Sequence, residues 1–117
     1  MMAEAVPNLP NDKKRVKVYE LRNNDWLDRG TGFCTAAFIF NEASRQYEPR
    51  VLVQSEDQPD RMLLETRICK EDGFQKQQDT LIVWTEPTNG VDMCLSFQES
   101  EGCAAIWSVI DSRVFCW

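Results

Sequence analysis

The segment QKQQDTLIVW, residues 75–84, decides the fold of this chain and the character of its surface. Polar residues run directly into Leu81-Ile82-Val83-Trp84, a short apolar run with strong strand propensity. A half-buried strand alternates polar and apolar residues, whereas here both faces of the strand carry large apolar side chains. Such a strand is either buried on both sides or presents one face as a docking surface. A chain of 117 residues has little protein left to cover a second face, so we favour the docking surface.

Alternating and turn-forming segments along the rest of the chain predict strands. Gly30 and Gly32 lie inside one of these strands and indicate a bulge or a sharp bend, which is how a small barrel turns its corners. In the last strand, Met93, Leu95 and Phe97 share one face. The predicted strands are residues 16–21, 26–40, 50–55, 61–69, 75–84 and 91–98, and the polar connections are residues 23–25, 41–48, 56–60 and 86–90.

The pattern becomes helical at Ser100. Ser100 is the expected N-cap, and Glu99 and Glu101 favour the positive end of a helix dipole. One apolar stripe at helical spacing consists of Cys103, Ile106, Trp107, Ile110 and Val114. We expect Trp107 to plug one end of a barrel. The sequence therefore predicts an all-β barrel or sandwich of six or seven short strands, closed by one amphipathic C-terminal helix.

Composition argues against several classes of function. A net charge of −6 argues against general affinity for nucleic acid or for an anionic membrane, since both favour a basic surface. The chain has no histidine, which removes Ser/His/Asp and Cys/His catalysis. Its paired carboxylates lie in predicted turns with no metal motif beside them. We therefore expect no enzyme activity, no metal site and no cofactor.

The cysteines and the apolar segments indicate an intracellular protein. Five cysteines with irregular spacing and no CxxC pair favour free thiols that act as small hydrophobes in a reducing compartment. They are Cys34, Cys69, Cys94, Cys103 and Cys116. No apolar run approaches the roughly 18–20 residues of a membrane span, and the N-terminus lacks the apolar region of a signal peptide.

One domain, residues 13–114, is the expected organisation. Residues 1–12 carry two prolines and little periodicity, so they are predicted to be a flexible lead-in. Residues 115–117 end the sequence on two aromatics, as expected where a longer chain would continue. We interpret the basic run Lys13–Lys17 as a solvated strand entrance, with a phosphoinositide or nuclear-import role as the alternatives.

Four motifs in order narrow the fold further. They are VKVY (16–19), WLDRGTG (26–32), QKQQDTLIVW (75–84) and LSFQE (95–99). The WxxRGxG string alone is also similar to Ran-binding domains, whereas QKQQDTLIVW followed by LSFQE is long and distinctive. From Arg15 to Ile110 the chain resembles the N-terminal EVH1-type domain of the Smek family, regulatory subunit 3 of protein phosphatase 4. The resemblance implies a PH-like, seven-stranded barrel or sandwich capped by a helix.

The resemblance also implies a function. EVH1-type domains are non-catalytic modules that bind short proline-containing peptides in an aromatic groove. The matching positions here are Tyr19, Trp26, Leu81 and Trp84, where Leu81 replaces an aromatic of the general family. Smek-type domains share this replacement and favour FxxP-like peptides, which fits a deeper apolar pocket for a phenylalanine. The family further implies recruitment of substrates to the phosphatase 4 catalytic complex through the rest of a full-length chain, a nuclear and cytoplasmic location with the nucleus favoured, and a role in the DNA damage response.

Two points stay open at this level. In a regular strand Leu81 and Trp84 point to opposite faces, so both line one groove only if a bulge or a strong twist intervenes. The alternative functions are a phosphoinositide-binding PH domain, which would need a basic pocket, and a Ran-binding-type domain that contacts a GTPase.

Overall fold

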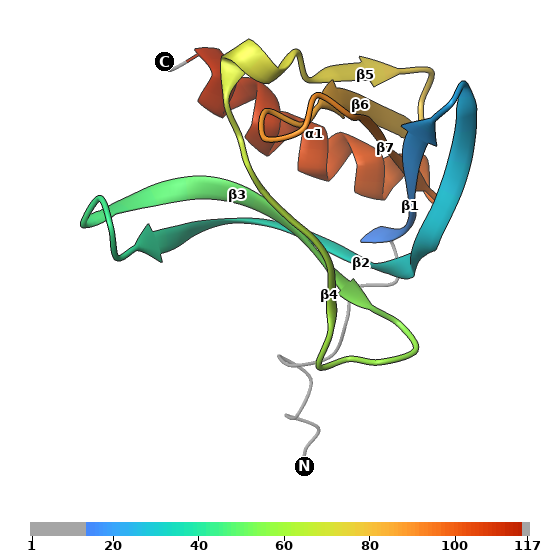
Figure 1. The fold of residues 1–117 in the computed structure, drawn as a ribbon, viewed down its shortest axis with the longest axis horizontal. Coiled ribbons are helices and arrows are strands. Elements are labelled where there is room, and N and C mark those ends of the chain that lie inside the picture. Colours follow the sequence, from blue (N-terminus) through green and yellow to red (C-terminus); the bar gives the residue numbers. More distant parts are fainter. Residues whose placement is uncertain (1–13, 116–117) are drawn as a thin grey trace.

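In a computed structural model, residues 14–115 are described, and within them seven strands precede a single α-helix (Figure 1). The elements are β1 (Arg15–Arg22), β2 (Asp25–Asn41), β3 (Gln46–Ser55), β4 (Met62–Arg67), a short 3-10 helix (Lys70–Asp72), β5 (Gln75–Gln77), β6 (Leu81–Thr85), β7 (Asp92–Phe97) and α1 (Ser100–Phe115). The strands form one antiparallel sheet in the order β4-β3-β2-β1-β7-β6-β5. The predicted all-β fold with one C-terminal helix is confirmed. The predicted lead-in (1–12), Cys116 and Trp117 lie outside the described residues.

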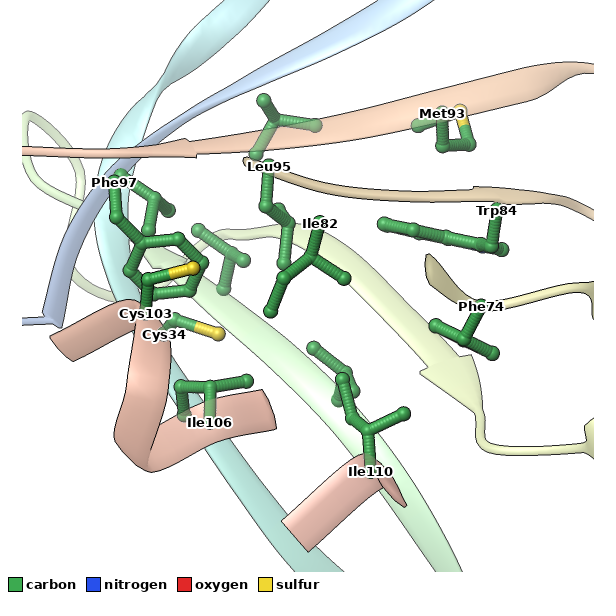
Figure 2. Packing of buried hydrophobic residues seen from close by; sticks show 14 of the residues in the cluster. Cys34, Phe74, Ile82, Trp84, Met93, Leu95, Phe97, Cys103, Ile106 and Ile110 are labelled. Carbon is green, nitrogen blue, oxygen red and sulfur yellow. The ribbon is translucent and has the colours of Figure 1, made fainter. Parts of the chain in front are cut away.

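The sheet is strongly curved, and α1 lies on its inner side between the β2–β3 hairpin and strands β5, β6 and β7 (Figure 1). The core lies between this inner face and the helix, where side chains from both halves of the sheet meet those of α1 (Figure 2). The fully buried members of the core are Val16, Val18, Val51, Val53, Ile68, Ile82, Leu95, Cys103, Ile106 and Ile110.

The predicted apolar faces of β7 and α1 are confirmed. Met93, Leu95 and Phe97 are all buried. On the helix, Cys103, Ile106 and Ile110 are buried, with Trp107 partly buried against the same cluster, and the side chain of Val114 lies outside the described part of the chain. The cap differs by one residue from the prediction. The Cys103 N–H donates to the Glu99 carbonyl at 3.2 Å, which is the first hydrogen bond of the helix. The N-cap residue is therefore Glu99 and not the predicted Ser100.

The glycines of β2 produce the expected bulge. Val18 pairs with Gly30 and Tyr19 with Asp28, so Arg29 is an extra residue on β2. Gly30 has a φ of 129°, and its N–H donates to the Asp28 carboxylate at 2.8 Å. The bulge turns the N-terminal part of β2 relative to the rest of the sheet.

Two connections differ from the sequence prediction. The segment 75–84 is two strands, because residues 78–80 form a turn with Gln78 at a φ of 53°. Half of the segment 41–48 is strand, since β2 and β3 stay paired as far as Asn41 and Gln46 and only residues 42–45 form the turn. The Asn41 side chain accepts backbone N–H bonds within the turn and so closes the hairpin tightly.

The described cysteines behave as predicted for buried free thiols. Cys34, Cys69, Cys94 and Cys103 are all buried free thiols that form no disulfide. Burial raises the pKa of Cys34 to about 12 and that of Cys94 to about 11, because the interior disfavours a thiolate. These thiols are therefore neutral, small apolar side chains at physiological pH.

Candidate functional site

The outer face of the sheet, opposite α1, carries a row of side chains across three neighbouring strands. Tyr19 of β1 pairs with Cys94 of β7, and Cys94 pairs in turn with Val83 of β6. Leu81 lies two residues before Val83, on the same face of β6. Tyr19, Leu81 and Val83 are each half-buried, so this face is apolar and partly exposed.

Trp26 adds an exposed aromatic ring to this row. The turn before it places Asn23 and Asn24 at φ values of 52° and 68°, in the left-handed region that asparagine tolerates. Trp26 then pairs with Leu21, which is two residues from Tyr19 and on the same face of β1. Its side chain remains 49% exposed, an unusual state for a tryptophan inside a strand.

Together these side chains enclose a cavity of about 310 Å³ on the outer face, which we name the apolar hollow. Its size lies at the lower end of the range typical of small-ligand sites, about 300–1,000 Å³. The lining residues are Tyr19, Trp26, Gln77, Leu81, Val83, Cys94 and Ser96. A hollow lined by aromatic and aliphatic side chains can bury a large apolar side chain.

A second cavity of about 330 Å³, the polar hollow, adjoins the first. The two hollows share Trp26, Gln77 and Val83, so Trp26 stands at their boundary. The polar hollow is lined by Trp26, Gly73, Gln75, Gln77, Val83, Trp84, Thr85 and Asp92. The outer face therefore has a groove with an apolar end and a polar end.

Trp84 lies on the inner face of β6, opposite Leu81. Its ring stacks on Phe74 in the core, and only 3% of the residue is exposed (Figure 2). The indole N–H donates to Glu86 at 3.1 Å, which satisfies its one polar group. The register of β6 with β7 is regular, so no bulge turns Trp84 outward. The structure thus brings Tyr19, Trp26 and Leu81 to the apolar hollow and Trp84 to the inner boundary of the polar hollow.

The cations near this face are paired with carboxylates. Glu20, whose side chain is 8% exposed, pairs with both Arg22 and Arg29. Lys17 lies 3.8 Å from Asp28. Arg29 is therefore paired within the fold, and its pair with Glu20 holds the bulge of β2 against β1.

Four lining residues of the apolar hollow were not among the predicted site residues: Gln77, Val83, Cys94 and Ser96. The alternation of side chains along a strand could have identified three of them. Val83 follows Leu81 at the spacing of one strand face, and Cys94 and Ser96 alternate with Met93, Leu95 and Phe97.

Within residues 14–115 we find no cluster of three or more Cys, Asp or Glu side chains that could hold a metal ion. In the same part of the chain, no helix combines the length and the apolar character that crossing a membrane requires.

Comparison with known proteins identifies the family. The model of the EVH1-like domain in PP4R3 protein matches residues 13–114. The chain belongs to this family. It is 43% identical, over 103 residues, to serine/threonine-protein phosphatase 4 regulatory subunit 3 of Kluyveromyces lactis. It is 44% identical, over 99 residues, to Suppressor of Mek1 of Dictyostelium discoideum. These matches cover 85% and 84% of this chain but only 14% and 9% of the relatives, so the chain spans about a tenth of their length.

Solved structures agree on the fold. The Ran-binding domain of the nuclear complex component Nup2 from Ashbya gossypii is similar with a TM-score of 0.68 and 18% identity, over 85% of this chain and 88% of that one. The EVH1 domain of Dm DCP1, solved with the XRN1 DBM peptide, is similar with a TM-score of 0.64 and 14% identity, over 86% and 71% of the two chains. The fold is PH-like and EVH1-type, and the family membership makes it a non-catalytic module of a phosphatase 4 regulatory subunit.

Proposed function

We propose that this domain recruits partner proteins to protein phosphatase 4 by binding short FxxP-like peptides, with the phenylalanine in the apolar hollow. The observation that carries the proposal is the convergence of Tyr19, Trp26 and Leu81 on one half-exposed cavity. A similar fold, the DCP1 EVH1 domain, was solved with a bound peptide, which supports this mode of action.

The size and lining of the apolar hollow support phenylalanine as the buried side chain. Leu81 and Val83 provide aliphatic surface, and Tyr19 and Trp26 provide rings for edge or stacked contacts with another aromatic. A proline three residues later would lie against the exposed part of Trp26. Burial of one phenylalanine contributes about 1.5–3 kcal/mol, and ordering of the peptide offsets part of this, so we expect micromolar affinity.

In this proposal Trp84 holds β6 in place and does not contact the phenylalanine. The docking of the full-length protein onto the phosphatase catalytic complex falls to its other regions. A role in the nucleus and in the DNA damage response remains part of the proposal.

Neither alternative function gains support from a particular observation. Among the described residues, Arg15 pairs with Glu56 at 2.8 Å, and Arg22 and Arg29 share Glu20, so each of these arginines already has a carboxylate partner. A phosphoinositide site needs cations that converge on an anion. The likeness to a Ran-binding domain is a likeness of fold at 18% identity.

The test is a fluorescence polarisation titration of the domain with a labelled FxxP peptide and with its Phe→Ala version. We expect micromolar binding of the first peptide and at least tenfold weaker binding of the second, as the loss of a buried ring implies. Trp26→Ala should weaken binding of the FxxP peptide to a similar extent. Equal binding of both peptides would contradict the proposal, as would the absence of binding to a domain shown to be folded. High salt should have little effect, because the contact is apolar.

A further inference from the structure

The polar hollow contains a carboxylate without a matching cation. Asp92 is exposed at the start of β7, and its carboxylate accepts a hydrogen bond from the Thr85 hydroxyl at 2.7 Å. No lysine or arginine among the described side chains forms an ion pair with Asp92, in contrast to the carboxylates of Glu20, Asp28 and Glu56. This hollow therefore carries uncompensated negative charge.

The other side chains that line this hollow are uncharged. Gln75 and Gln77 alternate with Lys76 along β5, so the lysine is on the opposite face of that strand and leaves the hollow without a cation. Trp26 forms the boundary with the apolar hollow and presents a half-exposed indole ring.

An exposed indole ring beside an unpaired carboxylate matches the guanidinium group of arginine. A guanidinium is planar and stacks on aromatic faces while its N–H groups donate to a carboxylate in the same plane. A lysine ammonium can make the ion pair but lacks the flat surface for stacking. A free carboxylate or phosphate would be repelled by Asp92.

We propose that the polar hollow binds an arginine side chain of the same peptide, flanking the apolar residue, with the guanidinium stacked on Trp26 and hydrogen-bonded to Asp92. This inference rests on the proposed function, since the peptide enters through the apolar hollow. The two adjoining hollows then select partners that carry an arginine at one fixed distance from the phenylalanine.

The test uses a set of peptides built on Phe-Ala-Ala-Pro, in which one arginine is moved through each of the three positions before and after this core. We expect one position to tighten binding about fivefold relative to glutamine at the same place, the sum of an exposed ion pair and a cation–π contact. The gain should be smaller for lysine and should decrease as salt is raised.

Variants of the domain separate the two hollows. Asp92→Asn keeps the shape of the side chain and should abolish the gain from arginine, whereas Asp57→Asn, in the distant β3–β4 turn, should keep it. If the core peptide binds but no arginine position strengthens its binding, or if the gain persists in Asp92→Asn, the proposed arginine site is contradicted. The proposed binding of phenylalanine in the apolar hollow is then unaffected. If no peptide of the set binds, the proposed function and this inference both fail.

Discussion

The rings of Trp84 and Phe74 are stacked in the core, with centroids 5.1 Å apart and planes inclined by 14°. This contact explains why two tryptophans of the family motifs have different roles. Trp84 is 3% exposed and holds β6 to the segment before β5, while Trp26 is 49% exposed on the outer face.

Alanine substitution should therefore separate the two tryptophans. We expect Trp84→Ala to lower the free energy of unfolding by about 3–5 kcal/mol, because it leaves a large cavity beside Phe74. Trp26→Ala should change it by less than about 1 kcal/mol, as for other surface positions. Urea unfolding followed by far-UV circular dichroism measures both. A mild effect at Trp84 together with a large one at Trp26 would contradict the assignment.

Gly32 should tolerate no side chain. A Cβ atom at this position would lie 2.1 Å from the carbonyl oxygen of Gln54, so Gly32→Ala must push β2 and β3 apart. We expect a loss of at least about 3 kcal/mol in unfolding free energy. Gly73→Ala is the matched control, since nothing lies within 4 Å of its Cβ. Because Gly73 has a φ of 71°, Gly73→Ala should lower the free energy of unfolding by only about 1–2 kcal/mol.

Alkaline pH should destabilise the domain through its buried thiols. Burial raises the pKa of Cys34 to about 12 and that of Cys94 to about 11 from an ordinary value of 9.0. Above pH 9.0 the unfolded chain loses these protons and the folded chain keeps them, so stability is full below this pH and falls as pH rises. Each thiol contributes a slope of about 1.4 kcal/mol per pH unit. Urea unfolding between pH 8 and pH 11 should show a shallower decline for the Cys34→Ala, Cys94→Ala double variant; an unchanged slope would refute this origin.

Leu81 should set the preference for a phenylalanine. Because Leu81 lines the apolar hollow, Leu81→Trp is expected to fill it and to weaken FxxP binding at least tenfold, about 1.4 kcal/mol. Leu81→Met conserves the volume and should retain binding within about threefold. Polarisation titrations of both variants with one FxxP peptide check this. Full binding by Leu81→Trp would mean that the phenylalanine does not enter the hollow.

Much of the fold followed from local patterns in the sequence. The alternation of Met93, Leu95 and Phe97 and the stripe of Cys103, Ile106 and Ile110 both predicted the faces that are buried, because burial imposes the periods of strand and helix. The turn at Gln78 was not predictable in the same way. No glycine or asparagine marks it, and the pairing of β5 with β6 holds the glutamine at positive φ.

The groove was predictable only in part. The family motifs pointed to Tyr19, Trp26, Leu81 and Trp84. Strand alternation left Trp84 beside Leu81 only if a bulge or a strong twist intervened, and β6 pairs regularly with β7. Asp92 and Gln77 come close to Trp26 only through the pairing of β5, β6 and β7 on the far side of β1, and no local pattern encodes that proximity.

Methyl NMR spectra of the domain during titration with an FxxP peptide test the central claim most directly, because β6 carries its own control. Leu81 and Val83 line the apolar hollow, whereas Ile82, between them, is fully buried on the other face. Ring currents of a phenylalanine in the hollow should shift the methyl signals of Leu81 and Val83 strongly and those of Ile82 little, and the Phe→Ala peptide should shift none. Saturable binding that leaves Leu81 and Val83 unmoved would place the peptide elsewhere and contradict the account.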